Sequence, residues 1–231
     1  MNKPRVLVGD IETMGGLKAH MSEVEAFGYK WLGEGKKATI LSCLDFKTSV
    51  FNDRPLLKEV SKIWNSADCV IFHYGERFDR RFLNTRIEAH GLPPLKPLRL
   101  IDTWRISRDN FALPGNSLAT LLKFFESPHQ KVDLTYREWR QVMLGQPKAL
   151  RKLNEHCAAD VLGLEWVFQN HLSHYTRYLP NVALANGGCP QCGAESLQKR
   201  GLSYKQTSVW QRYFCRGCMR WSEKPMGGKL R

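Results

Sequence analysis

Apolar residues occur in short runs in the first half of the chain and at helical spacing in the second half. The short runs are rich in β-branched and aromatic residues, and they predict strands at 6–9, 39–46, 48–51, 69–72 and 98–101. Residues 14–37 contain closely spaced glycines and no dominant period, so we expect irregular structure there. The first half of the chain therefore reads as a sheet built from short strands.

Helical spacing first occurs after Asn52 and Asp53, which are favourable N-cap residues, and Pro55 suits the first turn of the helix that follows. A second helix is expected at about 79–90, where Gly91 and two later prolines end it. Further helices are expected at 118–125, 136–144 and 147–171. Strands mixed with helices, followed by helices alone, indicate an α/β domain with a mixed sheet flanked by helices.

The 231 residues have room for one medium domain and a small appended module. We expect the main domain at 1–178, a linker at 179–186 and the module at 187–231. No apolar run approaches the roughly 18 residues of a membrane span, and the first residues lead into a strand without the apolar segment of a signal peptide. The sequence thus predicts a cytoplasmic protein that does not enter a membrane.

The chain is strongly basic, with 35 Lys and Arg against 22 Asp and Glu and a net charge of +13. An excess of this size favours a polyanionic partner such as nucleic acid, although a basic surface on a soluble protein is an alternative. Charge alone does not decide between the two.

Five residues that bear on chemistry stand where strands and helices bring side chains together. Asp10 and Glu12 follow a buried strand and, being two residues apart, point to the same face. Asp79 stands at a strand-to-helix junction, and His156 and Asp160 are four residues apart on one side of a helix. Taken singly, each has an ordinary structural explanation, namely a helix-start acid or a solvated surface residue.

Taken together, Asp10, Glu12, Asp79 and Asp160 with His156 resemble the DEDD exonuclease family of the ribonuclease H-like fold, in which three motifs occur in this order. The resemblance spans about 6–168. Two positions depart from the family pattern. The third motif has the spacing of the tyrosine subtype but carries His156 where tyrosine is usual, and Tyr74 stands where asparagine is common in the second motif. The second departure leaves open any contact that the asparagine would make.

The charges predict a cofactor independently of the resemblance. Four carboxylates about 6 Å apart would repel one another by roughly 3 kcal/mol per pair, and by on the order of 15 kcal/mol in total. They must therefore bind protons or cations, and oxygen ligands favour two Mg²⁺ or Mn²⁺ ions. The resemblance implies that Asp10 bridges both ions, that Glu12 and Asp160 hold the ion nearer the attacking water, and that Asp79 holds the other. It also implies that His156 orients or deprotonates that water.

Four cysteines near the C-terminus form two CxxC pairs, Cys189 with Cys192 and Cys215 with Cys218, separated by 22 residues. This spacing is typical of a zinc ribbon, in which one structural Zn²⁺ supplies folding energy that a small module lacks. The other cysteines lie in apolar or helical surroundings, so a disulfide framework is excluded.

The module at 187–231 carries nine Lys and Arg against two acids, and aromatic residues alternate with the basic ones. Such a surface suits single-stranded nucleic acid, although a protein-docking ribbon is the alternative. The ribbon is similar to those of transposases and phage nucleic-acid-binding proteins, and the combined layout is similar to phage-type exonucleases. The resemblance thus implies a bacterial cell or a phage-infected host. Candidate nucleic-acid contacts are Arg77, Lys131, Arg200, Trp210, Arg212, Tyr213 and Arg216, with Arg80, Arg81 and Arg86 as further candidates in the main domain.

The sequence therefore predicts a metal-dependent 3'-5' exonuclease acting on DNA or RNA, with single-stranded or 3'-ended DNA favoured. Its polarity is implied by the resemblance and not by residue spacing. A structure-selective endonuclease of the same fold and a catalytically silent nucleic-acid-binding regulator are the alternatives. We expect Asp102 to be structural, and Phe78 and Trp104 to belong to the core rather than to a base-stacking surface. The sequence makes no prediction of oligomeric state.

Overall fold

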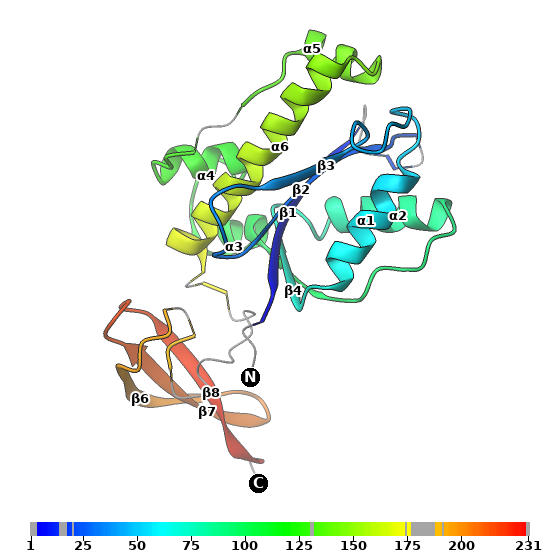
Figure 1. Cartoon of the computed structure of the whole chain (residues 1–231). Helices are drawn as coiled ribbons and strands as arrows, with labels where there is room; N and C mark the ends of the chain where they lie inside the picture. Colours follow the sequence, from blue (N-terminus) through cyan, green and yellow to red (C-terminus); the bar gives the residue numbers. More distant parts are fainter. Residues whose placement is uncertain are drawn as a thin grey trace. The chain divides into compact units, whose positions relative to one another are not determined.

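The computed structural model describes residues 4–13, 18–19, 21–129, 132–173, 175–176, 188–190 and 192–229. The chain divides into two compact units, one spanning residues 5–176 and the other containing the C-terminal strands (Figure 1). The linker predicted at 179–186 lies outside the described residues. No helix in the described part of the chain has both the length and the apolar character needed to span a membrane.

The first unit is built on a five-stranded mixed sheet with the order β3-β2-β1-β4-β5. Its strands are β1 (Val6–Thr13), β2 (Val24–Trp31), β3 (Thr39–Ser42), β4 (Cys69–Phe72) and β5 (Arg99–Asp102). β1, β2 and β3 pair antiparallel, whereas β1, β4 and β5 run parallel. The central strand β1 therefore links the antiparallel half to the parallel half, and the predicted mixed sheet is confirmed.

Two expectations about the strands were wrong. Residues 14–37 are not irregular throughout, because β2 is a full strand that pairs with β1 along most of its length. Its interior glycine and its buried Glu25 and Lys30 conceal the apolar run that marks the other strands. Residues 48–51, conversely, lie in a turn region and form no strand. The β-branched residues there have a local preference for strand structure, but the surrounding turns override it.

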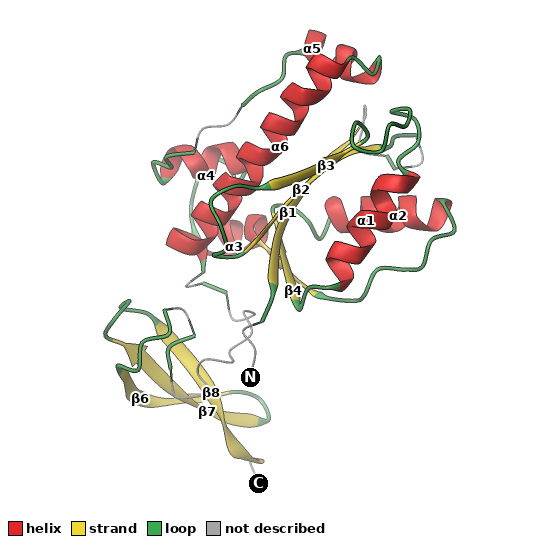
Figure 2. Cartoon of the chain, viewed as in Figure 1, coloured by secondary structure: helices red, strands yellow, loops and turns green. Residues whose placement is uncertain are grey.

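Helices cover both faces of the sheet (Figure 2). The helix α1 (Arg54–Asn65) and α2 (Asp79–Ala89) pack on one face, where Leu7, Ile11 and Phe27 of the sheet join the apolar sides of both helices. On the opposite face, α5 (Tyr136–Met143) and α6 (Pro147–Val167) enclose a second core that includes Ala26 and Cys157. The side chains of β1 thus alternate between two helical layers, as the strand period requires.

The remaining helices are α3 (Thr103–Asn110), which the sequence reading missed, and α4 (Leu118–Phe124), while α6 continues into a short π-helix, η1 (Phe168–Leu172). The predicted helices at 79–90, 118–125, 136–144 and 147–171 are confirmed to within a few residues. Pro55 lies in the first turn of α1 as expected, but the Asp53 side chain makes no capping bond. It binds Arg86 of α2 and His90, the residue that follows this helix, instead.

A glycine in β2 allows α6 to lie close to the sheet. A Cβ atom at Gly28 would stand 2.7 Å from Cys157 Sγ and 2.9 Å from Val161 Cγ2, both on α6. Gly28 pairs with Asp10 of β1 in the sheet. The close approach therefore brings the middle of α6 over the part of β1 that carries the predicted carboxylates.

The second unit contains a three-stranded antiparallel sheet of β6 (Leu197–Tyr204), β7 (Ser208–Cys215) and β8 (Trp221–Lys229), in that order. Two turns hold the cysteine pairs, and the second pair begins at the last residue of β7. Gly193 has a φ of +75° at the first turn, a conformation that L side chains rarely adopt. The unit is small, and its described aromatic residues are at least partly exposed.

Candidate active site and metal centres

The end of β1 presents two carboxylates toward α6. Asp10 pairs with Gly28 and Glu12 pairs with Ala26, whereas the intervening Ile11 lies in the core formed with α1 and α2. Glu12 is 8% exposed and Asp10 is partly buried. Strand alternation therefore places both acids on one face, as the sequence predicted.

The middle of α6 supplies the second part of the site. His156 Nε2 lies 3.2 Å from Glu12 Oε1 and 3.9 Å from Asp160 Oδ2. One ligand atom from each of Glu12, His156 and Asp160 lies within 4.8 Å of the others, and all three residues are buried. Groups that are 148 residues apart in sequence thus form one compact cluster.

The orientation of His156 is set by a backbone carbonyl. His156 Nδ1 is in hydrogen-bonding contact with the carbonyl oxygen of Val132. Because a carbonyl oxygen only accepts, Nδ1 carries the proton, and Nε2 is the nitrogen that faces the two carboxylates. The segment before α5 therefore fixes the ring of a residue on α6, a contact that the sequence did not reveal.

Asp79 begins α2 and reaches β1 from the parallel side of the sheet. Its Oδ1 accepts a hydrogen bond from the backbone N–H of Ile11 at 3.3 Å, beyond the point where β4 ends. Burial raises the pKa of Asp79 to about 7, and the charge of Asp102 adds to this effect. Asp79 therefore lies against the residue between Asp10 and Glu12, although it is not part of the compact cluster around His156.

A thiol also lies beside the carboxylates. One ligand atom each from Asp10, Glu12 and Cys157 lies within 4.8 Å of the others. Burial raises the pKa of Cys157 well above its ordinary value, with the charges of Asp10, Glu12 and Asp160 acting in the same direction. The thiol is therefore neutral, and a neutral thiol is a poor ligand for a hard cation.

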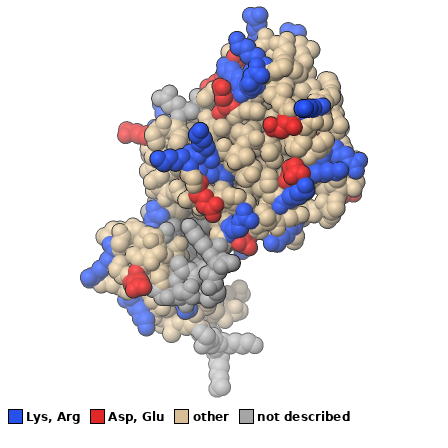
Figure 3. All heavy atoms as spheres, in the orientation of Figure 1, with Lys and Arg blue, Asp and Glu red and all other residues tan. Residues whose placement is uncertain are grey.

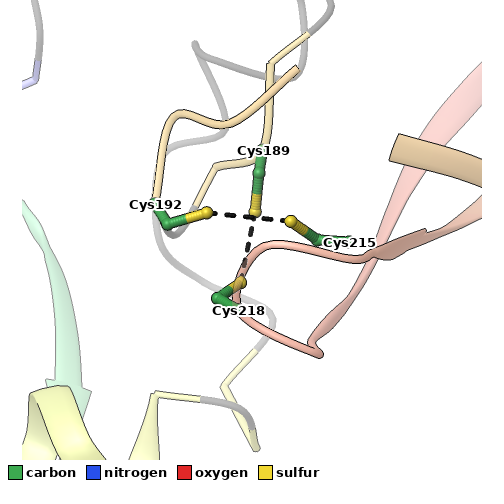
Figure 4. A group of neighbouring side chains, drawn as sticks. All are labelled: Cys189, Cys192, Cys215 and Cys218. Atoms are coloured by element: carbon green, nitrogen blue, oxygen red, sulfur yellow. Dashed lines mark hydrogen bonds between the residues drawn. The ribbon is translucent and has the colours of Figure 1, made fainter. Parts of the chain in front are cut away.

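The four C-terminal cysteines converge on one point (Figure 4). Cys189 Sγ lies 3.7 Å from Cys218 Sγ, and Cys192 Sγ lies 3.7 Å from Cys215 Sγ. Four thiolates held tetrahedrally at about 2.3 Å from a zinc ion would lie about 3.8 Å apart. The observed separations fit such an ion and are too long for disulfide bonds, which agrees with the free state of the described cysteines.

The backbone around the second cysteine pair favours a thiolate. The N–H of Cys218, together with that of Gly217, points to Cys215 Sγ and lowers the pKa of this thiol to about 6. Burial and the neighbouring thiols raise the pKa of Cys218 to about 12, because negative charges on adjacent buried sulfur atoms repel one another. A divalent cation would supply the missing charge.

A family model described as the RNase_H superfamily matches residues 7–171. This chain belongs to the RNase H superfamily. Among solved structures, the family B DNA polymerase from the hyperthermophilic archaeon Pyrobaculum calidifontis is similar over 89% of this chain, with a TM-score of 0.55 and 14% sequence identity. The chain spans about a third of the polymerase, 32% of its length, so this likeness bears on the fold alone. A search of curated proteins found no match.

The donor set of this RNase H superfamily member fits hard divalent cations. Glu12 and Asp160 offer carboxylate oxygens beside the imidazole of His156, Asp10 lies beside Glu12, and Asp79 accepts a hydrogen bond from the backbone N–H of Ile11. Carboxylate oxygens are the ligands preferred by Mg²⁺ and Mn²⁺. Burial makes the charged form of these acids unfavourable, as the raised pKa of Asp79 indicates. Bound cations would compensate the charge.

Asp102 has the structural role that the sequence predicted. Its carboxylate accepts hydrogen bonds from the backbone N–H groups of Tyr74 and Glu76 and caps the first turn of α3 through Trp104 and Arg105. Phe78 packs against the main core, as expected. Trp104 is only partly buried.

The candidate nucleic-acid contacts are divided between the two units. Arg77, Arg200, Arg212 and Arg216 are exposed, but Lys131 lies outside the described residues. On β7, Trp210 and Arg212 point to one face and Tyr213 to the opposite face, because side chains alternate along a strand. In the first unit, basic side chains lie among acidic ones on the face shown in Figure 3.

One basic candidate is not available to a phosphate. Arg86 is buried, and its guanidinium donates to Asp53 Oδ2 at 2.8 Å and to Asp53 Oδ1 at 2.9 Å. It also donates to the backbone carbonyl of Ala19. Arg86 therefore joins Ala19 and Asp53 to α2, and the expectation of a phosphate contact was wrong.

Proposed function

We propose that this RNase H superfamily member is a metal-dependent 3'-5' exonuclease. The observation that carries the proposal is the convergence of Glu12, His156 and Asp160 within 4.8 Å, beside Asp10 on the same strand. A buried group of carboxylates around one imidazole has no evident role in stability, because its charges repel one another. It suits a site that binds cations and hydrolyses a phosphodiester.

Each carboxylate has an assignment in this proposal. Asp10 offers a ligand atom within 4.8 Å of one from Glu12, and Asp79 binds the backbone of Ile11, the next residue after Asp10. Asp10 would help to hold both ions, Glu12 and Asp160 would hold one of them, and Asp79 would hold the other. Two bound Mg²⁺ or Mn²⁺ ions would supply Lewis acidity for the attacking water and for the leaving oxygen. The protein would contribute the rigid arrangement of strand and helix that keeps these acids together.

His156 would act as the proton acceptor or the orienting group for water. Its Nδ1 is held by Val132, so Nε2 is directed toward Glu12 and Asp160. A general base must lie within hydrogen-bond reach of the proton that it takes, and Nε2 borders the region between the two carboxylates. His156→Gln would retain a side chain of similar reach while removing the base.

The second unit would bind zinc and assist binding of nucleic acid. The spacing of the four sulfur atoms supports a tetrahedral Zn²⁺. Exposed Arg200, Arg212 and Arg216 support contact with phosphates. The partner would be a DNA strand, with RNA as the alternative substrate.

The test is digestion of single- and double-stranded DNA and RNA, labelled at the 5' end, in Mg²⁺, Mn²⁺ or chelator. A ladder that shortens from the 3' end only with metal is the expected result. Asp10→Ala and Asp160→Ala should each lower the rate by about 100-fold or more, since even outer partners of a metal site contribute 10- to 100-fold. Glu34→Ala, which removes an exposed acid, is the matched control.

Two outcomes would replace the proposal. Cleavage of circular single-stranded DNA would indicate an endonuclease, because a circle has no end. Binding without hydrolysis under any of the metal conditions would indicate a regulator. Full activity in purified, folded Asp10→Ala would remove the assigned site from the reaction.

A further inference from the structure

An aromatic and basic cluster lies where β4 and β5 end. The rings of Tyr74 and Trp104 meet edge to face, with centroids 5.1 Å apart. The guanidinium carbons of Arg77 and Arg108 lie 5.9 Å and 5.3 Å from the centroid of the Trp104 ring. The cluster thus combines two aromatic rings with two cations at distances typical of cation–π contacts.

The backbone at Tyr74 is in a conformation that a bulky residue rarely adopts. Its φ is +63°, in the left-handed region that favours glycine or asparagine. Asp102 Oδ1 accepts the Tyr74 N–H at 2.9 Å, and the N–H groups of Arg77 and Phe78 donate to the Tyr74 carbonyl. The turn therefore holds this strained residue from both sides, an arrangement that is common at functional sites.

The cluster is accessible to a ligand. Tyr74 is 37% exposed, Arg77 and Arg108 are exposed, and Trp104 is partly buried. The rings are thus not part of a closed core, contrary to the expectation for Trp104. A partly exposed aromatic pair beside two arginines is suited to unpaired bases, which stack on the rings while the cations meet the phosphates.

The cluster also borders the candidate active site. Asp102 binds the turn that carries Tyr74, and its charge raises the pKa of Asp79. Asp79 follows Tyr74 by five residues at the start of α2 and binds the backbone of β1. A single strand of nucleic acid that reached the carboxylates from this side would pass the aromatic rings first.

We propose that Tyr74 and Trp104, flanked by Arg77 and Arg108, form a stacking surface that selects unpaired bases next to the scissile phosphate. The inference rests on the proposed nuclease function for its biological meaning and deepens it by naming the substrate class, single-stranded ends. It assigns Tyr74 a contact with bases, where the family pattern has asparagine at this position. Duplex ends would have to fray before they could bind here.

The test separates binding from hydrolysis by measuring affinity in an Asp10→Asn background. The probe is a fluorescein-labelled single-stranded DNA dodecamer, compared with the same strand carrying base-free sugars at its last three 3' positions. Tyr74→Asn removes the ring and suits the left-handed backbone, so it should fold at least as stably as the parent. Trp104→Ala removes the second ring, and Tyr74→Phe retains the first.

Fluorescence anisotropy should show Kd for the intact strand rising about 5- to 150-fold in Tyr74→Asn and in Trp104→Ala. Tyr74→Phe should bind like the parent, as should Tyr136→Ala, which removes a tyrosine that is 80% exposed on α5. The base-free strand should bind weakly to the parent and no more weakly to Tyr74→Asn, because the stacking contact is already absent.

Unchanged affinity of Tyr74→Asn for the intact strand would overturn the proposal. So would an equal loss of affinity for both strands, since this would indicate contact with the backbone and not with bases. Failure of the nuclease proposal would be seen separately, as absence of turnover by the protein with Asp10 intact, and would leave the binding results interpretable.

Discussion

Lys30 on β2 donates from Nζ to both carboxylate oxygens of Glu165 on α6, at 2.7 Å and 2.6 Å. Both side chains are nearly inaccessible, at 5% and 10% exposure, and Glu165 also accepts from the backbone N–H of Gly33. Glu165 lies about one and a half turns after Asp160 on α6. The ion pair therefore fixes the position of α6 along the strand that neighbours β1, and with it the cluster of Glu12, His156 and Asp160.

Lys30→Met should destabilise the protein strongly, because it leaves the buried Glu165 carboxylate without its cation. We expect a loss of about 3–5 kcal/mol in the free energy of unfolding, measured by urea denaturation. Lys30→Met combined with Glu165→Leu should recover most of the loss, since two apolar side chains need no pairing. If the double variant were as unstable as the single one, the buried charge would not be the cause.

Gly28→Ala should move α6 away from the sheet. The added Cβ would stand 2.7 Å from Cys157 Sγ and 2.9 Å from Val161 Cγ2, so overpacking should cost about 1–3 kcal/mol. Hydrolysis should fall by more than stability alone explains, because Asp160 moves with the helix. Adding Cys157→Ala removes the nearer clash and should restore part of both stability and activity. An active, fully stable Gly28→Ala would contradict this account of helix placement.

Glu25 should make stability depend on pH. Burial raises its pKa to about 7, with the charges of Glu23 and Asp53 adding to the effect and the Cys43 thiol, 3.5 Å away, opposing it. The unfolded chain releases the proton near pH 4.5, whereas the folded protein retains it until about pH 7. The contribution of Glu25 to the free energy of unfolding is therefore most favourable below pH 4.5. It declines as the pH rises to about 7 and is constant above that pH.

The measurement is the unfolding free energy of wild type and Glu25→Gln at pH 5 and pH 8. The variant should gain stability relative to wild type between these values, by up to about 3 kcal/mol. Glu34→Gln, a substitution of an exposed glutamate, should show no such relative gain. Equal pH dependence of wild type and Glu25→Gln would mean that Glu25 is ionised in the folded protein throughout this range.

Removal of zinc should unfold the C-terminal unit and leave residues 5–176 folded. The unit has a small core, so a cation bound by Cys189, Cys192, Cys215 and Cys218 would supply a large part of its folding free energy. A chelator, or Cys215→Ser, should expose 188–229 to limited proteolysis while the first unit stays resistant. The purified chain should contain one zinc per molecule by elemental analysis. Resistance of the second unit after complete loss of metal would show that its sheet is stable alone.

Local patterns determined most of the helices, β1, β4 and β5, and the facing of Asp10 and Glu12, because side-chain direction follows directly from the period of a strand or helix. The CxxC pairs likewise predicted a cysteine cluster from spacing alone. These features depend on residues close together in sequence, where backbone geometry limits the possible arrangements.

Only the tertiary structure decided the rest. β2 is a strand because β1 and β3 pair with it on both sides, which outweighs its glycine and its buried charges. The contact of Val132 with His156, the pairing of Arg86 with Asp53, and the meeting of Tyr74 with Trp104 each join residues brought together by chain topology. Such contacts depend on how closely whole elements pack, and a hydrophobic pattern does not specify that distance.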